Sequence, residues 1–114
     1  MLPVELSFLS AIEILNLNFN SFSGIIPLEL AYITGLQILD LGSNYLTGPI
    51  PITLGFLSTL EILNLERNGF TGSIPPDLVG LSALLTELRL SSNFLTGSLP
   101  TLVGELTALQ VLHL

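Results

Sequence analysis

The amino-acid sequence predicts an α/β solenoid, in which short coils stack in one direction and share one hydrophobic core. Three observations indicate this fold: an asparagine recurs at spacings of 24, 24 and 25 residues, a glycine and a proline follow it at fixed offsets, and a leucine pair in an L-x-L pattern precedes it. The recurring residues are Asn20, Asn44, Asn68, Asn93, Gly24, Gly48, Gly72, Gly97, Pro27, Pro51, Pro75 and Pro100. A single coil cannot bury its own leucines, so neighbouring coils must stack.

Each coil predicts the same order of local structures, and the second coil illustrates it. Leu39 and Leu41 alternate with other residues, and this period of two is typical of a short strand, which the recurring asparagine ends. Residues 47–51 contain Gly and Pro and exclude a regular helix, whereas residues 51–57 can hold a 3₁₀ or helical turn. The third coil has one extra residue within 82–86, where we expect a loop to absorb it.

The chain is predicted to be a single array that covers residues 1–114. It consists of a partial copy at 1–11, copies at 12–35, 36–59, 60–84 and 85–108, and a partial copy at 109–114. Repeat arrays need polar terminal units to cover their core, and neither partial copy contains such a cap. We therefore expect an uncapped fragment of a longer solenoid, with an unpaired edge on its last strand.

The coil pattern resembles the leucine-rich repeat, whose consensus L-x-x-L-x-L-x-x-N-x-L is matched in four copies over essentially the whole chain. A following [ST]-G-x-[IL]-P segment is similar to the plant-specific subclass with about 24 residues per repeat. This segment stands at residues 23–27, 47–51, 71–75 and 96–100. The resemblance implies a right-handed superhelix, with a short parallel β-sheet on its concave face and 3₁₀ or irregular turns on its convex face.

The composition and charge exclude several classes of function. Two arginines stand against nine aspartates and glutamates, so the net charge is -7 and no cluster of cations can neutralise nucleic-acid phosphates. Without cysteine, the chain has neither disulfides nor a thiolate zinc site. Residues 41–60 carry no charge, but their glycines and prolines argue against a membrane span, and residues 1–9 lack the basic start of a signal peptide.

Three recurring residue types are predicted to have structural roles. The asparagine amide can donate to and accept from backbone groups of adjacent coils, which would form a hydrogen-bonded ladder. The glycine suits a tight turn in which a side chain would clash. The isoleucine or leucine before each proline is expected to anchor its segment in the core, and Phe22 and Phe70 are expected to be core residues.

The outward residues of the predicted strands form columns on the concave face, and these are the candidate binding residues. One column is apolar and the next is polar, which is typical of a surface that recognises an extended peptide or protein. The candidates are Ile14, Asn16, Asn18, Ile38, Asp40, Ile62, Asn64, Glu66, Arg67, Glu87 and Arg89. Isoleucine is also favoured in strands without any ligand, so this alternative stays open.

Two further groups of residues have two interpretations each. Arg67 and Arg89 either capture a carboxylate of a ligand or pair with neighbouring carboxylates, which is the commoner arrangement. Phe8, Tyr32 and Phe56 fall five residues after successive prolines, on the convex side. We expect these three rings to pack between coils, and a lateral contact with a co-receptor or another partner is the alternative.

The sequence predicts no catalytic residues, no cofactor and no metal site. A nucleophilic triad needs a histidine beside a serine and a carboxylate, and the single histidine, His113, lies in the incomplete last copy. Phosphate-binding and kinase glycine-rich motifs are missing, and the carboxylates are spread along the chain. We therefore expect that the chain is not an enzyme and that any kinase domain lies outside it.

The family resemblance implies a function in recognition. The chain is similar to part of the ectodomain of a plant receptor-like kinase or receptor-like protein, a family whose members bind peptides, hormones or partner receptors at the cell surface. This predicts a protein or peptide ligand on the concave face, an extracellular or cell-surface location, no nucleic-acid partner and no membrane span in the chain. Two alternatives stay open: a secreted inhibitor that resembles the polygalacturonase-inhibiting proteins, and a structural or adhesive spacer.

Overall fold

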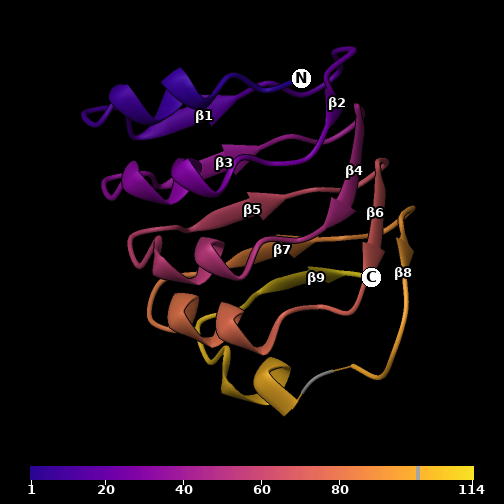
Figure 1. Ribbon diagram of the computed structural model, residues 1–114. Helices are drawn as coiled ribbons and strands as arrows, with labels where there is room; N and C mark the ends of the chain where they lie inside the picture. The colour runs from indigo at the N-terminus through magenta and orange to yellow at the C-terminus, as the bar shows by residue number, and fades with distance from the viewer. Residues whose placement is uncertain (100) are drawn as a thin grey trace.

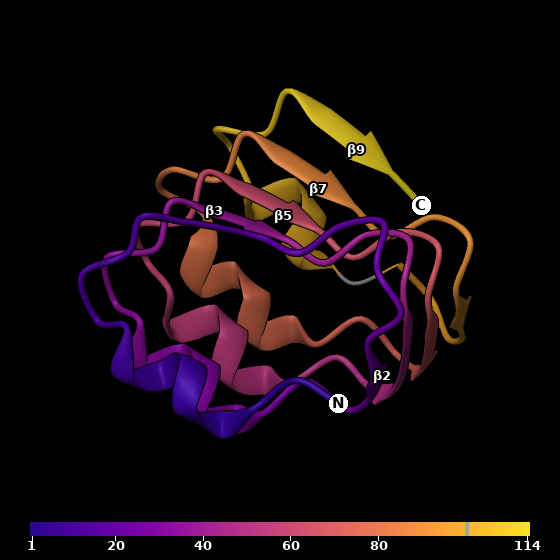
Figure 2. The same cartoon turned by 90° about the horizontal axis from the view of Figure 1, so that it is seen from above.

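The structure, a computed structural model, describes residues 1–99 and 101–114, so the prediction for Pro100 lies outside the described residues. The described residues form nine strands and five 3₁₀ helices, which repeat coil by coil along one direction (Figure 1). The strands make two parallel sheets, one of five strands and one of four. Seen from above, the larger sheet and the helices lie on opposite sides of the core (Figure 2). The predicted solenoid is confirmed.

Both sheets follow the order of the coils along the chain. The first sheet holds β1 (Ile14–Asn16), β3 (Ile38–Asp40), β5 (Ile62–Asn64), β7 (Glu87–Arg89) and β9 (Val111–His113). The second holds β2 (Ser23–Gly24), β4 (Tyr45–Pro49), β6 (Gly69–Gly72) and β8 (Phe94–Leu95). The helices are η1 (Val4–Phe8), η2 (Leu28–Tyr32), η3 (Ile52–Phe56), η4 (Pro76–Leu81) and η5 (Thr101–Glu105). Within this part of the chain each element packs against its equivalent in the neighbouring coils.

A continuous spine of leucines connects the coils. The register of the first sheet places Leu39 beside Leu63 and Leu63 beside Leu88, and all three side chains are buried. Leucines of the helices complete the same cluster from the opposite side. Burying one such side chain contributes about 1.5–3 kcal/mol, so the shared spine stabilises the array more than any contact within one coil.

Each of the helices η1 to η4 begins directly after a proline, whose fixed φ and missing N–H suit the start of a helical turn. After η2, the N–H of Leu36 donates to the carbonyl oxygen of Ile33, three residues back, at 3.0 Å. After η4, the N–H of Leu85 donates to Leu81, four residues back, at 3.1 Å. This wider turn absorbs the extra residue of the third coil, as predicted.

The second sheet is an element that the sequence analysis missed. Its strand β4 contains Gly48 and Pro49, and neither residue type favours a strand. Hydrogen bonds between coils create the sheet, with Thr47 beside Gly69 in the register. The recurring glycines are required by their backbone, because φ lies between +77° and +85° at all four of them, a region that side chains rarely adopt. The predicted clash applies only to Gly48, where a Cβ atom would lie 2.9 Å from Ile25, and Gly72 has open space around this position.

The asparagine ladder is confirmed, and Asn68 shows one complete rung. Its Nδ2 group donates to the carbonyl oxygens of Leu41, Leu65 and Glu66 at 3.0, 3.2 and 3.2 Å. Its Oδ1 accepts the backbone N–H of Leu46 at 3.0 Å. Since Leu41 and Leu46 belong to the preceding coil, one side chain links two coils and the strand ends of both sheets.

Of the other three ladder asparagines, two link neighbouring coils and Asn20, in the first complete coil, does not. Asn44 and Asn93 also donate to a carbonyl oxygen of the preceding coil. Asn20 is exposed and donates only within its own coil, to Leu17 and Asn18, because residues 1–11 contain no strand that it can reach. The prediction that every ladder asparagine faces inward was therefore wrong for Asn20.

Two predictions about the core were right only in part. Ile26 and Ile50, which precede prolines, are buried as expected, but Leu99 at the same position is 51% exposed. Phe70 is fully buried, whereas Phe22 is half-buried at the edge of the core. Phe22 and Leu99 belong to the first and last complete copies, where the described residues supply a complete neighbouring coil on one side only. Ile74, which precedes Pro75 in the third copy, is also only half-buried.

Candidate functional site

The outward face of the first sheet, which we call the sheet face, carries eight of the eleven candidate binding residues in two adjacent columns, and the other three, Asn18, Glu66 and Arg67, follow the ends of β1 and β5. The first column is Ile14, Ile38, Ile62, Glu87 and Val111, and the second is Asn16, Asp40, Asn64, Arg89 and His113. All of these side chains are exposed or half-buried. The predicted alignment is confirmed, and the role of these residues in binding stays a prediction.

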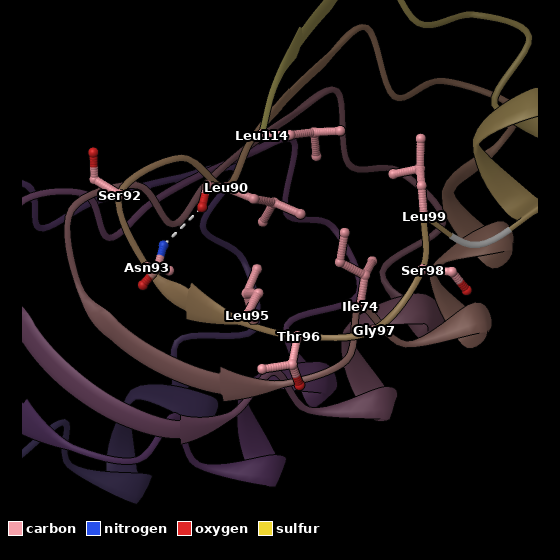
Figure 3. A pocket seen from close by; sticks show the side chains of 10 residues that line it. All are labelled: Ile74, Leu90, Ser92, Asn93, Leu95, Thr96, Gly97, Ser98, Leu99 and Leu114. Atoms are coloured by element: carbon pink, nitrogen blue, oxygen red, sulfur yellow. Dashed lines mark hydrogen bonds between the residues drawn. The ribbon is translucent and has the colours of Figure 1, made fainter.

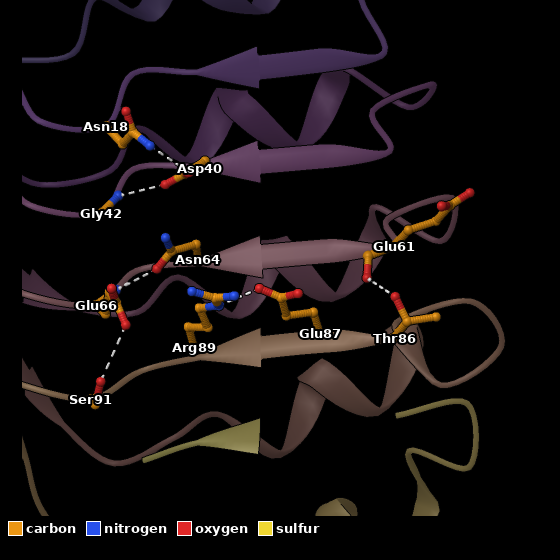
Figure 4. A network of polar contacts seen from close by, with 10 residues as sticks. All are labelled: Asn18, Asp40, Gly42, Glu61, Asn64, Glu66, Thr86, Glu87, Arg89 and Ser91. Carbon is orange, nitrogen blue, oxygen red and sulfur yellow. Dashed lines mark hydrogen bonds and ion pairs between the residues drawn. The ribbon is translucent and has the colours of Figure 1, made fainter. Parts of the chain in front are cut away.

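The polar column has a structural role that the sequence analysis missed. Asn16, Asp40 and Asn64 each accept a hydrogen bond from the backbone N–H two residues further on, at 3.1, 3.0 and 3.0 Å. Asp40 also accepts a bond from Nδ2 of Asn18 at 2.9 Å (Figure 4). These side chains therefore form Asx turns that end their strands, and an Asn or Asp just before a turn is the usual sequence signal.

The charged residues of the sheet face are only partly paired. Nε of Arg89 and Oε1 of Glu87 form an ion pair along β7, and Oγ of Ser91 donates to Oε2 of Glu66 at 3.4 Å (Figure 4). Arg67 is exposed and makes no ion pair with the described residues. The pairing interpretation is confirmed for Arg89, and Arg67 is the cation that a ligand can reach without breaking a pair.

The aromatic column does not pack between coils, so that prediction was wrong. Phe8, Tyr32 and Phe56 end the first three helices and are 80%, 69% and 69% exposed. With about three residues per turn, Leu30 and Ile33 point in the same direction, and both are buried in the core. Tyr32 lies between them in sequence, so it points away from the core, and its equivalents in the neighbouring coils do the same.

A cavity of about 400 Å³ lies at the C-terminal end of the array (Figure 3). Its lining includes Leu90, Leu95, Leu99 and Leu114. Leu95 takes the coil position of Phe70, which is fully buried beside the following coil. The cavity is therefore the open end of the leucine spine, and we do not count it as a separate ligand site.

Within 1–99 and 101–114, His, Asp and Glu side chains do not gather in a group of three that could hold a metal ion. In the same ranges, every helix is too short or too polar to cross a bilayer. The sheet face, with its aligned columns, is the candidate functional site.

These features define a class of protein: a parallel-stranded solenoid with one sheet face open for binding. The sequence matches the Leucine Rich Repeat family over residues 11–33, 35–57, 59–81 and 84–106. The chain belongs to the leucine-rich-repeat family. Among curated proteins, none matches it.

Several solved plant receptor structures are similar to the chain. The leucine-rich-repeat ectodomain of the receptor kinase GASSHO1/SCHENGEN3 from Arabidopsis thaliana, in complex with CASPARIAN STRIP INTEGRITY FACTOR 2, is 44% identical, with a TM-score of 0.92 over 95% of this chain. A TDR receptor is 40% identical, with a TM-score of 0.96 over 99% of this chain. The Arabidopsis receptor kinase HAESA, in complex with the peptide hormone IDA and the co-receptor SERK1, is 38% identical, with a TM-score of 0.91 over 96%. The chain spans 13%, 19% and 18% of these three proteins.

Proposed function

We propose that the chain is a non-catalytic recognition module, part of a receptor-like ectodomain outside the cell, whose sheet face binds an extended peptide or protein segment. The observation that carries this proposal is the apolar column of Ile14, Ile38 and Ile62 beside a polar column on one rigid sheet. The similar HAESA structure contains a peptide hormone, which supports a peptide as the ligand.

The geometry of the sheet determines how such a ligand can lie. The inner strands are paired with neighbours on both sides, so their backbone groups cannot pair with a further strand. The ligand must then contact side chains on the sheet face. Strands are about 4.8 Å apart, so three isoleucines span roughly 10 Å, which matches about three extended residues. Two apolar ligand residues separated by one other residue fit this column.

Charged residues in and beside the polar column restrict which polar groups the ligand can carry. Asp40 and Glu66 supply carboxylate oxygens that already accept bonds from neighbouring residues, so they favour ligand groups that donate one more hydrogen bond. Arg67 has donors and no acceptor, so it favours a carbonyl or carboxylate. A ligand that offers both donors and an acceptor beside its apolar pair satisfies both requirements.

Replacing Ile38 and Ile62 together by alanine is expected to weaken peptide binding at least about tenfold, because each isoleucine in contact contributes on the order of 1 kcal/mol or more. The peptides are selected from a displayed random library against the immobilised 114-residue chain. Fluorescence polarisation measures their affinity, and circular dichroism during heating checks that the variant is folded.

The matched control is the double change Leu28→Ala and Ile52→Ala, which removes two exposed aliphatic side chains from the helices. It should leave the peptide affinity within about twofold of the original. If the selected peptides bind the Ile38→Ala, Ile62→Ala variant as tightly as the original chain, the sheet face is not the recognition surface. A structural spacer also predicts that this variant keeps its peptide affinity, because a spacer does not use the sheet face for recognition.

A further inference from the structure

A strip of exposed apolar side chains crosses the first three helices, on the opposite side of the core from the sheet face. We call it the helix strip, and it consists of Phe8, Tyr32, Phe56, Val4, Leu28 and Ile52. These are the first and last residues of η1, η2 and η3, and their exposed fractions run from 48% to 80%. Because equivalent positions of successive coils stack, the six side chains form an aliphatic row at the start of the helices and an aromatic row at their end.

The helix strip has a defined end after η3. In the fourth coil Gly80 takes the position of Phe56, and a Cβ atom there would lie 2.1 Å from the carbonyl oxygen of Gly55. The close approach of the two backbones leaves no room for a side chain. In η5 the same position is Glu105, which is exposed. The apolar surface is therefore confined to three adjacent coils.

The size of the helix strip sets it apart from scattered surface residues. An aromatic side chain presents about 150–250 Å² when fully exposed, so three rings that are two-thirds exposed or more give roughly 300–500 Å². Patches of about 300–600 Å² are the largest that a typical monomer exposes, and they are often functional.

Carboxylates border the helix strip. Glu5, Glu29 and Asp77 are the second residues of their helices and are exposed. With about three residues per turn, the second and fifth residues of such a helix point in the same direction. Glu5 therefore lies on the side of η1 that carries Phe8, and Glu29 on the side of η2 that carries Tyr32. Arg89 lies in β7 and pairs with Glu87, and Arg67 follows the end of β5, so within the described residues neither guanidinium pairs with this border.

The charge of the border decides between possible partners. A second copy of the chain has the same carboxylates and a net charge of -7, so two helix strips facing each other would repel. An anionic lipid surface is disfavoured for the same reason. A surface with apolar residues flanked by lysine or arginine is complementary in both respects.

We propose that the helix strip is a second interaction surface, which docks a basic, apolar segment of a partner protein. Aromatic or aliphatic side chains of that segment cover the three rings, and its cations face Glu5 and Glu29. This docking uses a different side of the molecule from the sheet face, so a ligand and a partner can be bound at the same time.

The test uses a short fluorescein-labelled peptide of alternating leucine and arginine as the probe. Replacing Phe8, Tyr32 and Phe56 together by serine is expected to weaken its binding to the chain at least about tenfold, because three aromatic contacts are lost. The affinity of the original chain should also fall as salt rises from low to physiological concentration, since the charged border is exposed.

The chain offers a closely matched control. Phe19, Tyr45 and Phe94 are two phenylalanines and one tyrosine away from the helix strip, and they are 78%, 68% and 70% exposed. Their triple change to serine should alter the probe affinity by less than about twofold. The sheet-face variant with Ile38→Ala and Ile62→Ala should also bind the probe normally, which separates this proposal from the proposed function.

Several outcomes would overturn the proposal. The proposal is wrong if the original chain fails to bind the probe, or if the two triple variants lose affinity equally. A probe with glutamate in place of arginine that binds as tightly would show that charge plays no part. If sedimentation finds that the original chain associates with itself and that the Phe8, Tyr32, Phe56 triple variant does not, the occupant is a second copy instead of a basic partner.

Discussion

Replacing Asn68 by aspartate is expected to lower the free energy of unfolding by about 3–5 kcal/mol, although the two side chains have nearly the same shape. Nδ2 of Asn68 donates to three backbone carbonyl oxygens at 3.0 to 3.2 Å, and the side chain is buried. A carboxylate donates nothing there and places its negative charge against those oxygens. Urea denaturation near neutral pH, followed by circular dichroism, measures the loss.

Two related variants make this result interpretable. Asn20→Asp changes the exposed equivalent of Asn68 and should cost less than about 1 kcal/mol. Asn68→Leu removes the same donors without adding a charge and should cost about 1–3 kcal/mol. Acidification should restore part of the stability of the Asn68→Asp variant, because burial disfavours the charged form of the introduced carboxyl. Equal losses at positions 20 and 68 would contradict the ladder.

Replacing Gly55 by alanine is expected to lower the free energy of unfolding by about 2–3 kcal/mol, although alanine gains up to about 1 kcal/mol over glycine in a helix. A Cβ atom at Gly55 would lie 2.1 Å from the carbonyl oxygen of Asp77. That oxygen belongs to the backbone of η4 and cannot rotate away. The helices η3 and η4 must then move apart, which opens the core between the buried Leu54 and Leu78.

Gly104 provides the control, because it takes the same coil position in η5 as Gly55 takes in η3. Among the described residues beyond its own helix and chain neighbours, no atom lies within 4 Å of the position that a Cβ atom of residue 104 would take. The change Gly104→Ala should therefore be neutral or slightly stabilising, by up to about 1 kcal/mol. Thermal melting of both variants measures the difference. If they unfold at the same temperature, the close approach between η3 and η4 does not limit the fold.

The alignment of the candidate binding residues could be predicted from the sequence, whereas most of their hydrogen bonds could not. Ile38 and Ile62 were placed in one column because a strand period of two and a coil of 24 residues leave a single register. The Asx turns of Asp40 and Asn64 were missed, although residue type and turn together carry that signal. Arg89 pairs with Glu87 because both point outward from one strand, two residues apart.

The sequence by itself determined the coil length, the order of strand, turn and helix in each coil, the leucines of the spine, and the asparagines that link inner coils, Asn44, Asn68 and Asn93. These features recur about every 24 residues, so they can be recognised by comparing the copies within one sequence. Only the tertiary structure decided that a second sheet forms around Gly48 and Pro49, and that Phe8, Tyr32 and Phe56 stay exposed. The second sheet depends on how closely the backbones of successive coils approach. The exposure of the three rings depends on the direction in which each side chain leaves its 3₁₀ helix. The residue pattern of a single coil gives neither the approach nor the direction.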